Sequence, residues 1–131
     1  EYCHNFLNLV DAAINNRYHL EFPFILEPSQ FSKNTNPKRL VAISGPNITT
    51  PKGLKNTIFM SNLSGSKPVN SKWLLKDNVK KIGISEQGDF LTSQLNLWAE
   101  PHVMSPELFV AIYIEPDETF CWERRFSVHQ L

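Results

Sequence analysis

The chain has 131 residues, of which 41% are hydrophobic and 20% charged, and its 13 basic residues balance 13 acidic ones. This length and apolar content are typical of one domain of about 100–150 residues, which we place over residues 1–131. The composition excludes a disordered tail and a four-cysteine zinc site, and its apolar runs are far shorter than the roughly 20 residues of a membrane helix.

The first segment is the only one with helical spacing. Apolar residues recur there at i, i+3, i+4 and i+7, the spacing that lines one face of a helix: Phe6, Leu9, Val10 and Ala13. Asn5 is suited to cap such a helix, and Asn15-Asn16 to end it. We therefore predict one short helix over residues 5–16, with its apolar stripe packed on a sheet.

From residue 18 onward, the chain consists of short runs in which apolar residues recur at every second position, separated by Pro, Gly, Asn and Ser. This pattern is typical of strands and turns. The expected strands cover residues 18–26, 39–44, 55–63, 72–76, 79–85, 90–98, 108–114 and 120–128. About eight strands without alternating helices predict a mainly β fold, an antiparallel β-sandwich that is jelly-roll-like or immunoglobulin-like.

Four connections are also expected from the sequence. Residues 27–38 and 45–54 should be long loops, and Glu86–Asp89 should be a hairpin turn. Leu108–Ile114 is apolar throughout, which predicts a central strand covered on both faces, and the following Glu115–Glu118 should be a type I turn.

Two cysteines and two sequons favour a secreted or surface-exposed location, while a cytoplasmic or virion location stays open. Cys3 and Cys121 lie near opposite ends, and a disulfide between them would be worth roughly 4–5 kcal/mol in the chain-entropy model. Two free, buried thiols are the alternative. Asn47 and Asn62 each begin an Asn-x-Ser/Thr motif, which is a candidate site of N-glycosylation.

Charge is balanced overall but segregated along the sequence. Ten basic residues and one acid lie between Lys33 and Lys81, whereas residues 82–123 contain eight acids and no Lys or Arg. Either neighbouring strands mix these charges on folding, or the molecule has a basic and an acidic face. The candidate basic contact surface comprises Lys52, Lys55, Lys67, Lys72, Lys76, Lys80 and Lys81. The candidate acidic contact surface comprises Glu115, Asp117 and Glu118.

No motif in the sequence supports catalysis or metal binding. His-x-His, His-Glu-x-x-His, Cys-x-x-Cys, phosphate-loop and nucleophile-elbow patterns are all missing. We therefore expect no enzyme, no catalytic residue, no metal site and no cofactor. In the last strand, Arg124 should be buried against an acid or an aromatic ring, and Arg125 should pair with Glu123 at the surface.

These observations favour a non-enzymatic recognition domain that binds a protein partner through its loops and charged faces. One alternative is a structural assembly subunit, such as a jelly-roll coat or shell protein, which self-associates through complementary charged surfaces. Another is a carbohydrate-binding module that uses an exposed Trp73, Trp98 or Trp122. The lysines are compatible with a polyanion or glycan, but neutral net charge and few interleaved aromatic residues disfavour nucleic acid.

Overall fold

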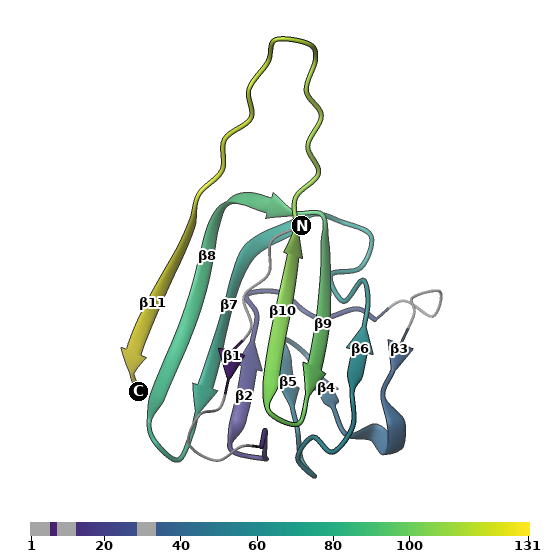
Figure 1. Ribbon diagram of the computed structural model, residues 1–131, viewed down its shortest axis with the longest axis vertical. Helices are drawn as coiled ribbons and strands as arrows, with labels where there is room; N and C mark the ends of the chain where they lie inside the picture. Colours follow the sequence, from purple (N-terminus) through teal and green to yellow (C-terminus); the bar gives the residue numbers. More distant parts are fainter. Residues whose placement is uncertain (1–5, 8–12, 29–33) are drawn as a thin grey trace.

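The computed structural model describes residues 6–7, 13–28 and 34–131 and contains two antiparallel sheets (Figure 1). The six-stranded sheet has the order β11 (Arg124–Gln130), β8 (Ile82–Thr92), β7 (Val69–Asp77), β2 (Tyr18–Glu21), β5 (Asn47–Thr49) and β4 (Ala42–Ser44). The five-stranded sheet has the order β1 (Phe6–Leu7), β10 (Val103–Phe109), β9 (Gln94–Glu100), β6 (Ile58–Met60) and β3 (Asn34–Thr35). The predicted antiparallel β-sandwich is confirmed.

Local hairpins join β4 to β5, β7 to β8 and β9 to β10, and every other connection crosses from one sheet to the other. One crossing contains the short 3-10 helix η1 (Pro37–Arg39), between β3 and β4. Among the described residues, no helix is long and apolar enough to span a membrane.

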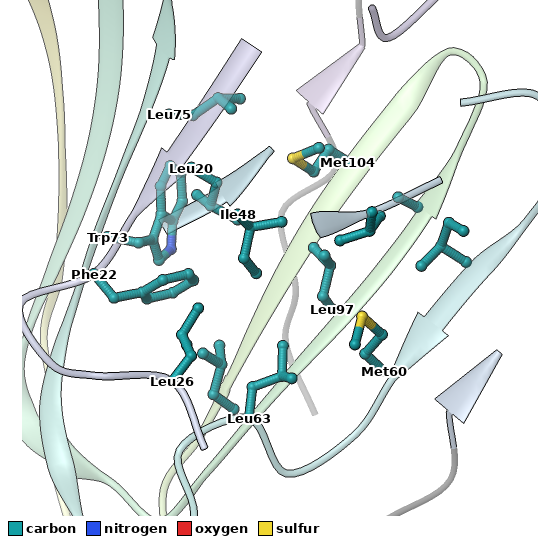
Figure 2. Close-up of a cluster of buried hydrophobic side chains, with 14 of the residues drawn as sticks. Leu20, Phe22, Leu26, Ile48, Met60, Leu63, Trp73, Leu75, Leu97 and Met104 are labelled. Atoms are coloured by element: carbon teal, nitrogen blue, oxygen red, sulfur yellow. The ribbon is translucent and has the colours of Figure 1, made fainter. Parts of the chain in front are cut away.

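The core lies between the two sheets and is built from alternate residues of their facing strands (Figure 2). The six-stranded sheet contributes Leu20, Ile48 and Trp73, and the five-stranded sheet contributes Leu97 and Met104; all five are buried. Side chains that alternate along a strand point to opposite faces, so the period-two pattern of the sequence directs these residues inward.

The predicted N-terminal helix is wrong at Phe6–Leu7, which form β1 and pair with Met104 and Val103 of β10. Residue 5 and residues 8–12 of that prediction lie outside the described residues, and residues 13–17 contain a bend and a turn but no helix. A short apolar segment with helical spacing can also form an edge strand, because the edge of β10 offers backbone N–H and C=O groups with which the segment forms hydrogen bonds.

The predicted turn at Glu86–Asp89 is also wrong, because β8 continues through it from Ile82 to Thr92. The break falls at Ser93, between β8 and β9, so Leu91 lies exposed on β8 instead of in the core. Tertiary contacts override the local polarity here: Glu86 is fully buried and accepts hydrogen bonds from two side chains of neighbouring strands.

The apolar run Leu108–Ile114 is not a central strand. β10 ends at Phe109, and residues 111–114 are exposed to solvent. The turn that follows is present, with the Glu118 amide donating to the Glu115 carbonyl at 3.1 Å. Its third residue, Asp117, has φ of 69°, which is the feature of a type II turn and not of the predicted type I.

The remaining predicted strands are present with shifted ends, and both predicted long loops contain regular structure. Residues 27–38 include the two-residue strand β3, which pairs with β6, and the start of η1. Residues 45–54 contain β5, which pairs with β2 on one side and β4 on the other. Its Asn47-Ile48-Thr49 sequence places Ile48 in the core, while the flanking polar residues are half-buried. A single inward apolar residue is enough for a three-residue strand, which is too short to show a period in sequence.

Candidate functional site

The link between β10 and β11, residues 110–123, projects well beyond one end of the sandwich (Figure 1). We call it the arm. Because β10 and β11 belong to opposite sheets, the link has to cross about 10 Å, a distance that three or four extended residues span. The arm is several times longer than this, and all of its residues from 111 to 123 are exposed. Its length therefore exceeds what joining two strands requires.

The exposed residues of the arm are rich in large apolar side chains. Tyr113 is 91% exposed and Trp122 is 48% exposed, and the other exposed apolar residues there are Ile112, Ile114 and Phe120. Phe120 and Trp122 stack, with ring centroids 6.0 Å apart and planes inclined at 29°. A scattered apolar residue at a surface is ordinary, but a concentration of this kind marks an interaction site.

Hydrogen bonds fix the base of the arm to the sandwich. On the β10 side, the Ser93 amide donates to the Phe109 carbonyl at 2.8 Å. On the β11 side, the Glu123 amide donates to Asp89 Oδ1 at 2.8 Å, and the Asp89 amide donates to the Glu123 carbonyl at 3.2 Å. Between base and tip, residues 110–123 contain no assigned strand, so the limbs do not stabilise each other through a β-ladder.

A buried polar cluster lies where the arm enters β11. Glu86 accepts a hydrogen bond from Trp73 Nε1 at 2.9 Å on one oxygen and from Arg124 Nε on the other. The Arg124 guanidinium also lies over the Phe126 ring, 5.8 Å from its centroid. The expected burial of Arg124 against an acid is confirmed, and so is the exposed Arg125–Glu123 pair.

A pocket of about 490 Å³ lies beneath the arm. Its lining is mostly apolar, with one acid and one base, and consists of Phe90, Glu107, Leu108, Phe109, Val110, Ile112, Trp122 and Arg124. A hollow of this size and character accepts a small apolar molecule or a few apolar side chains of a partner.

The candidate acidic surface gathers at the tip of the arm, where Glu115, Asp117 and Glu118 are all exposed. The tip is ordered by a second hydrogen bond, in which the Glu115 amide donates to Glu118 Oε2 at 3.1 Å.

The candidate basic surface is divided by the fold. Lys52 and Lys55 lie in the β5–β6 link, and Lys80 and Lys81 lie in the β7–β8 turn, all at the end of the sandwich opposite the arm (Figure 1). Lys67 lies between β6 and β7, whereas Lys72 and Lys76 lie on β7 itself. Lys76 pairs with Glu21 at 2.7 Å.

Folding does not join the two charged stretches of the sequence. Four ion pairs between described residues each have one partner outside both stretches: Arg17–Asp77, Lys76–Glu21, Arg124–Glu86 and Arg125–Glu123. Although β7 and β8 are neighbours, Lys72 faces Gln87 and Lys76 faces Gly83. On these two neighbouring strands, neither Lys72 nor Lys76 therefore faces an acid of the second stretch directly.

The other predicted site residues are dispersed. Cys121 is exposed on the arm, not buried as a core-strand cysteine would be; Cys3 lies outside the described residues, and the disulfide stays a prediction. Asn47 is half-buried in β5, and Asn62 is half-buried with φ of 53°. Ser64, the hydroxyl residue of the second sequon, is buried and accepts the Leu95 amide at 3.1 Å.

The three tryptophans differ in access. Trp73 is fully buried, Trp98 is half-buried and Trp122 is exposed on the arm. In the described part of the chain, no three His, Cys, Asp or Glu residues lie together in a way that could hold a metal ion.

Sequence reasoning missed the arm because its apolar run has the composition of a core strand. The signal available was the acidic Glu115–Glu118 turn, which separates the aliphatic-rich residues 110–114 from the aromatic residues Phe120 and Trp122. Comparison with protein-family models, with curated proteins and with solved structures gives no match.

Proposed function

We propose that this chain is a non-enzymatic protein-recognition domain and that the arm is its contact element. The observation that supports the proposal most directly is the exposure of large apolar side chains on a segment longer than its connection requires, above all Tyr113 and Trp122. Aromatic residues of this kind provide most of the binding energy at protein interfaces, because they bury a large area at low cost in conformational entropy.

We take a protein as the partner because a projecting segment presents its side chains outward. A sugar or another small molecule is bound in a concave site and would occupy only the pocket beneath the arm, leaving Tyr113 uncovered. Trp73 is buried and bonded to Glu86, which leaves Trp122 as the exposed indole. The pocket beneath the arm fits the same role, since it could receive apolar side chains of the partner.

A second candidate function is the structural assembly subunit. It is favoured by one specific observation, the acidic tip of the arm and the lysines at the opposite end of the same sandwich. A molecule with complementary ends is suited to heterologous contacts between its own copies.

The test is site-specific photo-crosslinking of the full chain in an extract of the cells that produce it. A photoreactive p-benzoylphenylalanine replaces Tyr113 in one variant and Ile25 in a matched control, which is 61% exposed but lies outside the arm. We expect a discrete protein adduct from position 113 and not from position 25. Equal adduct yields at both positions, or no adduct at position 113 in extract or in concentrated purified protein, would contradict the proposal.

A further inference from the structure

The arm and the β7–β8 turn lie at opposite ends of the six-stranded sheet. Asp77 faces Ile82 in register at one end of the β7–β8 ladder, and Arg124, where the arm enters β11, faces Gly88 near the other. At about 3.3 Å per residue, β8 alone separates its two ends by roughly 30 Å. Salt at physiological concentration screens charges beyond about 8 Å, so the arm tip cannot neutralise the turn within one molecule.

The β7–β8 turn forms a corner that combines exposed apolar and basic side chains. Val79 is 71% exposed, and Ile82 and Leu131 are also exposed large hydrophobic residues. The Leu131 amide donates to the Lys81 carbonyl at 2.8 Å, which holds Leu131 against the turn. We call residues 79–82 together with Leu131 the basic corner, because Lys80 and Lys81 lie exposed within it.

The described charges at this end of the sandwich are mostly positive. Besides Lys80 and Lys81, four exposed basic residues lie at the same end but toward the β4 edge of the six-stranded sheet (Figure 1), in η1 and the β5–β6 link: Lys38, Arg39, Lys52 and Lys55. Two acids among the described residues lie at this end. Asp77 is paired with Arg17, and Glu100 accepts a hydrogen bond from the Thr57 hydroxyl at 3.4 Å.

The outer part of the arm has the opposite combination. The apolar Tyr113 and Ile114 are followed directly by the acids Glu115, Asp117 and Glu118, and residues 110–123 contain no Lys or Arg. The arm thus presents an apolar segment beside negative charge, and the basic corner presents an apolar cluster beside positive charge.

We propose that the arm of one copy docks on the basic corner of a second copy, with Tyr113 and Ile114 against Val79, Ile82 and Leu131. The acids of the tip then lie against Lys80 and Lys81. The inference rests on the proposed function and names its partner as a copy of the same chain. Complementary charge steers such an encounter, sets its orientation and contributes a salt-dependent part of the affinity, while apolar burial supplies the rest.

The two surfaces are different, so the contact is heterologous and leaves a free arm and a free corner on every pair. Association of this type grows into an open chain or closes into a ring, depending on the rotation between neighbours. This geometry makes a charge-exchange experiment decisive, because either surface can be reversed without touching the other.

The test uses the purified full chain and measures its mass in solution by sedimentation, over a range of protein and salt concentrations. The arm-reversed variant combines Glu115→Lys, Asp117→Lys and Glu118→Lys, and the corner-reversed variant combines Lys80→Glu and Lys81→Glu. We expect wild-type assemblies that dissociate as salt rises, and at least roughly tenfold weaker association for each variant alone. An equimolar mixture should associate again, because each reversed surface then meets its complement.

The matched control combines Lys67→Glu and Lys72→Glu, which makes the same change in net charge away from the corner. It should associate like the wild type, and circular dichroism should show that all variants keep their fold. Any one of three results would overturn the inference. The wild type stays monomeric at every concentration, the equimolar mixture fails to associate, or the control associates as weakly as the corner-reversed variant. If position 113 nevertheless crosslinks a different protein in the cell extract, the recognition function stands and only the choice of partner is wrong.

Discussion

Glu86 is the residue on which the junction of arm and sandwich depends. Its carboxylate is fully buried and is bonded to both Trp73 and Arg124, which belong to the strands on either side of it. A buried charge is tolerated only when its partners replace the lost water, so each member of this cluster needs the others. The cluster ties β11, and with it one limb of the arm, to the centre of the sheet.

Glu86→Ala should lower the free energy of unfolding by about 3–5 kcal/mol, because it removes the buried carboxylate that pairs with Arg124 and accepts the hydrogen bond of the Trp73 indole. Urea unfolding monitored by tryptophan fluorescence measures the change. Glu21→Ala is the control, since it removes the partly exposed pair with Lys76 and should cost less than about 1 kcal/mol. Equal costs for the two substitutions would show that the Glu86 cluster has no special structural role.

Cys121 provides a second test at the scale of single residues. If the predicted bridge to Cys3 forms, titration of the denatured, unreduced protein with a thiol reagent should find no free thiol. The physical consequence would be large, because the bridge would close a loop over almost the whole chain and restrict the unfolded state. Two free thiols per chain would reject the bridge, and in that case the exposed Cys121 should also react in the folded protein.

At the scale of elements, the arm stands apart from the strands that support it. Its outer residues are exposed and outside the core, so they contribute little to the stability of the sandwich. The sandwich needs only a short crossing between β10 and β11, so the length of the arm is not a requirement of the fold.

Replacing residues 113–120 by Asn-Gly should change the free energy of unfolding by less than about 1 kcal/mol, because the shorter loop loses no core contact and costs less entropy to close. Denaturation by guanidinium chloride would measure this change in the free energy of unfolding. Leu97→Ala, at a fully buried position of β9, is the positive control and should cost about 2–5 kcal/mol. A loss above about 2 kcal/mol on shortening the arm would mean that the arm is part of the folded core.

The same elements show how far the sequence determines local structure. Leu95 and Leu97 of β9 are buried as their spacing predicts, because alternate residues of a strand share a face. The run Leu108–Ile114 has an equally strong signal, but half of it is exposed. Apolar composition reports that a segment will be buried against something, and it does not distinguish the chain's own core from another molecule's surface.

At the scale of the whole molecule, the two ends differ in charge: the arm at one end is acidic, and the corner at the other end is basic. An open assembly built from heterologous contacts stops growing at a subunit that lacks one of the two contact surfaces. A closed dimer has no such growing end. The arm-reversed variant keeps an intact corner, so it can accept a wild-type arm and then offers no arm of its own.

Adding the arm-reversed variant at about one part in ten should therefore lower the mean mass of wild-type assemblies well beyond simple dilution, as light scattering would show. The expectation follows from the two different surfaces of a heterologous contact, since each incorporated variant terminates one chain. A fall in mass no greater than the fraction added would indicate a closed assembly of fixed size instead of an open chain. The Lys67→Glu, Lys72→Glu control should cause no fall.

The amino-acid sequence by itself determines the fold class and part of the core of this protein, including Trp73, Leu95 and Leu97. Period-two spacing, frequent turn residues and the lack of helical stretches after residue 17 lead to an antiparallel sandwich, because side-chain alternation is a local property of extended chain. The sequence also shows that basic and acidic residues are separated along the chain.

Only the tertiary structure decides where those charges and apolar runs finally lie. Whether Glu86 is a turn residue or a buried acid depends on Trp73 and Arg124, which approach it from neighbouring strands. Whether the lysines meet the acids depends on strand order, which places Lys80 and Lys81 at one end and the arm at the other. Contacts between distant residues set these positions, and no local pattern encodes them.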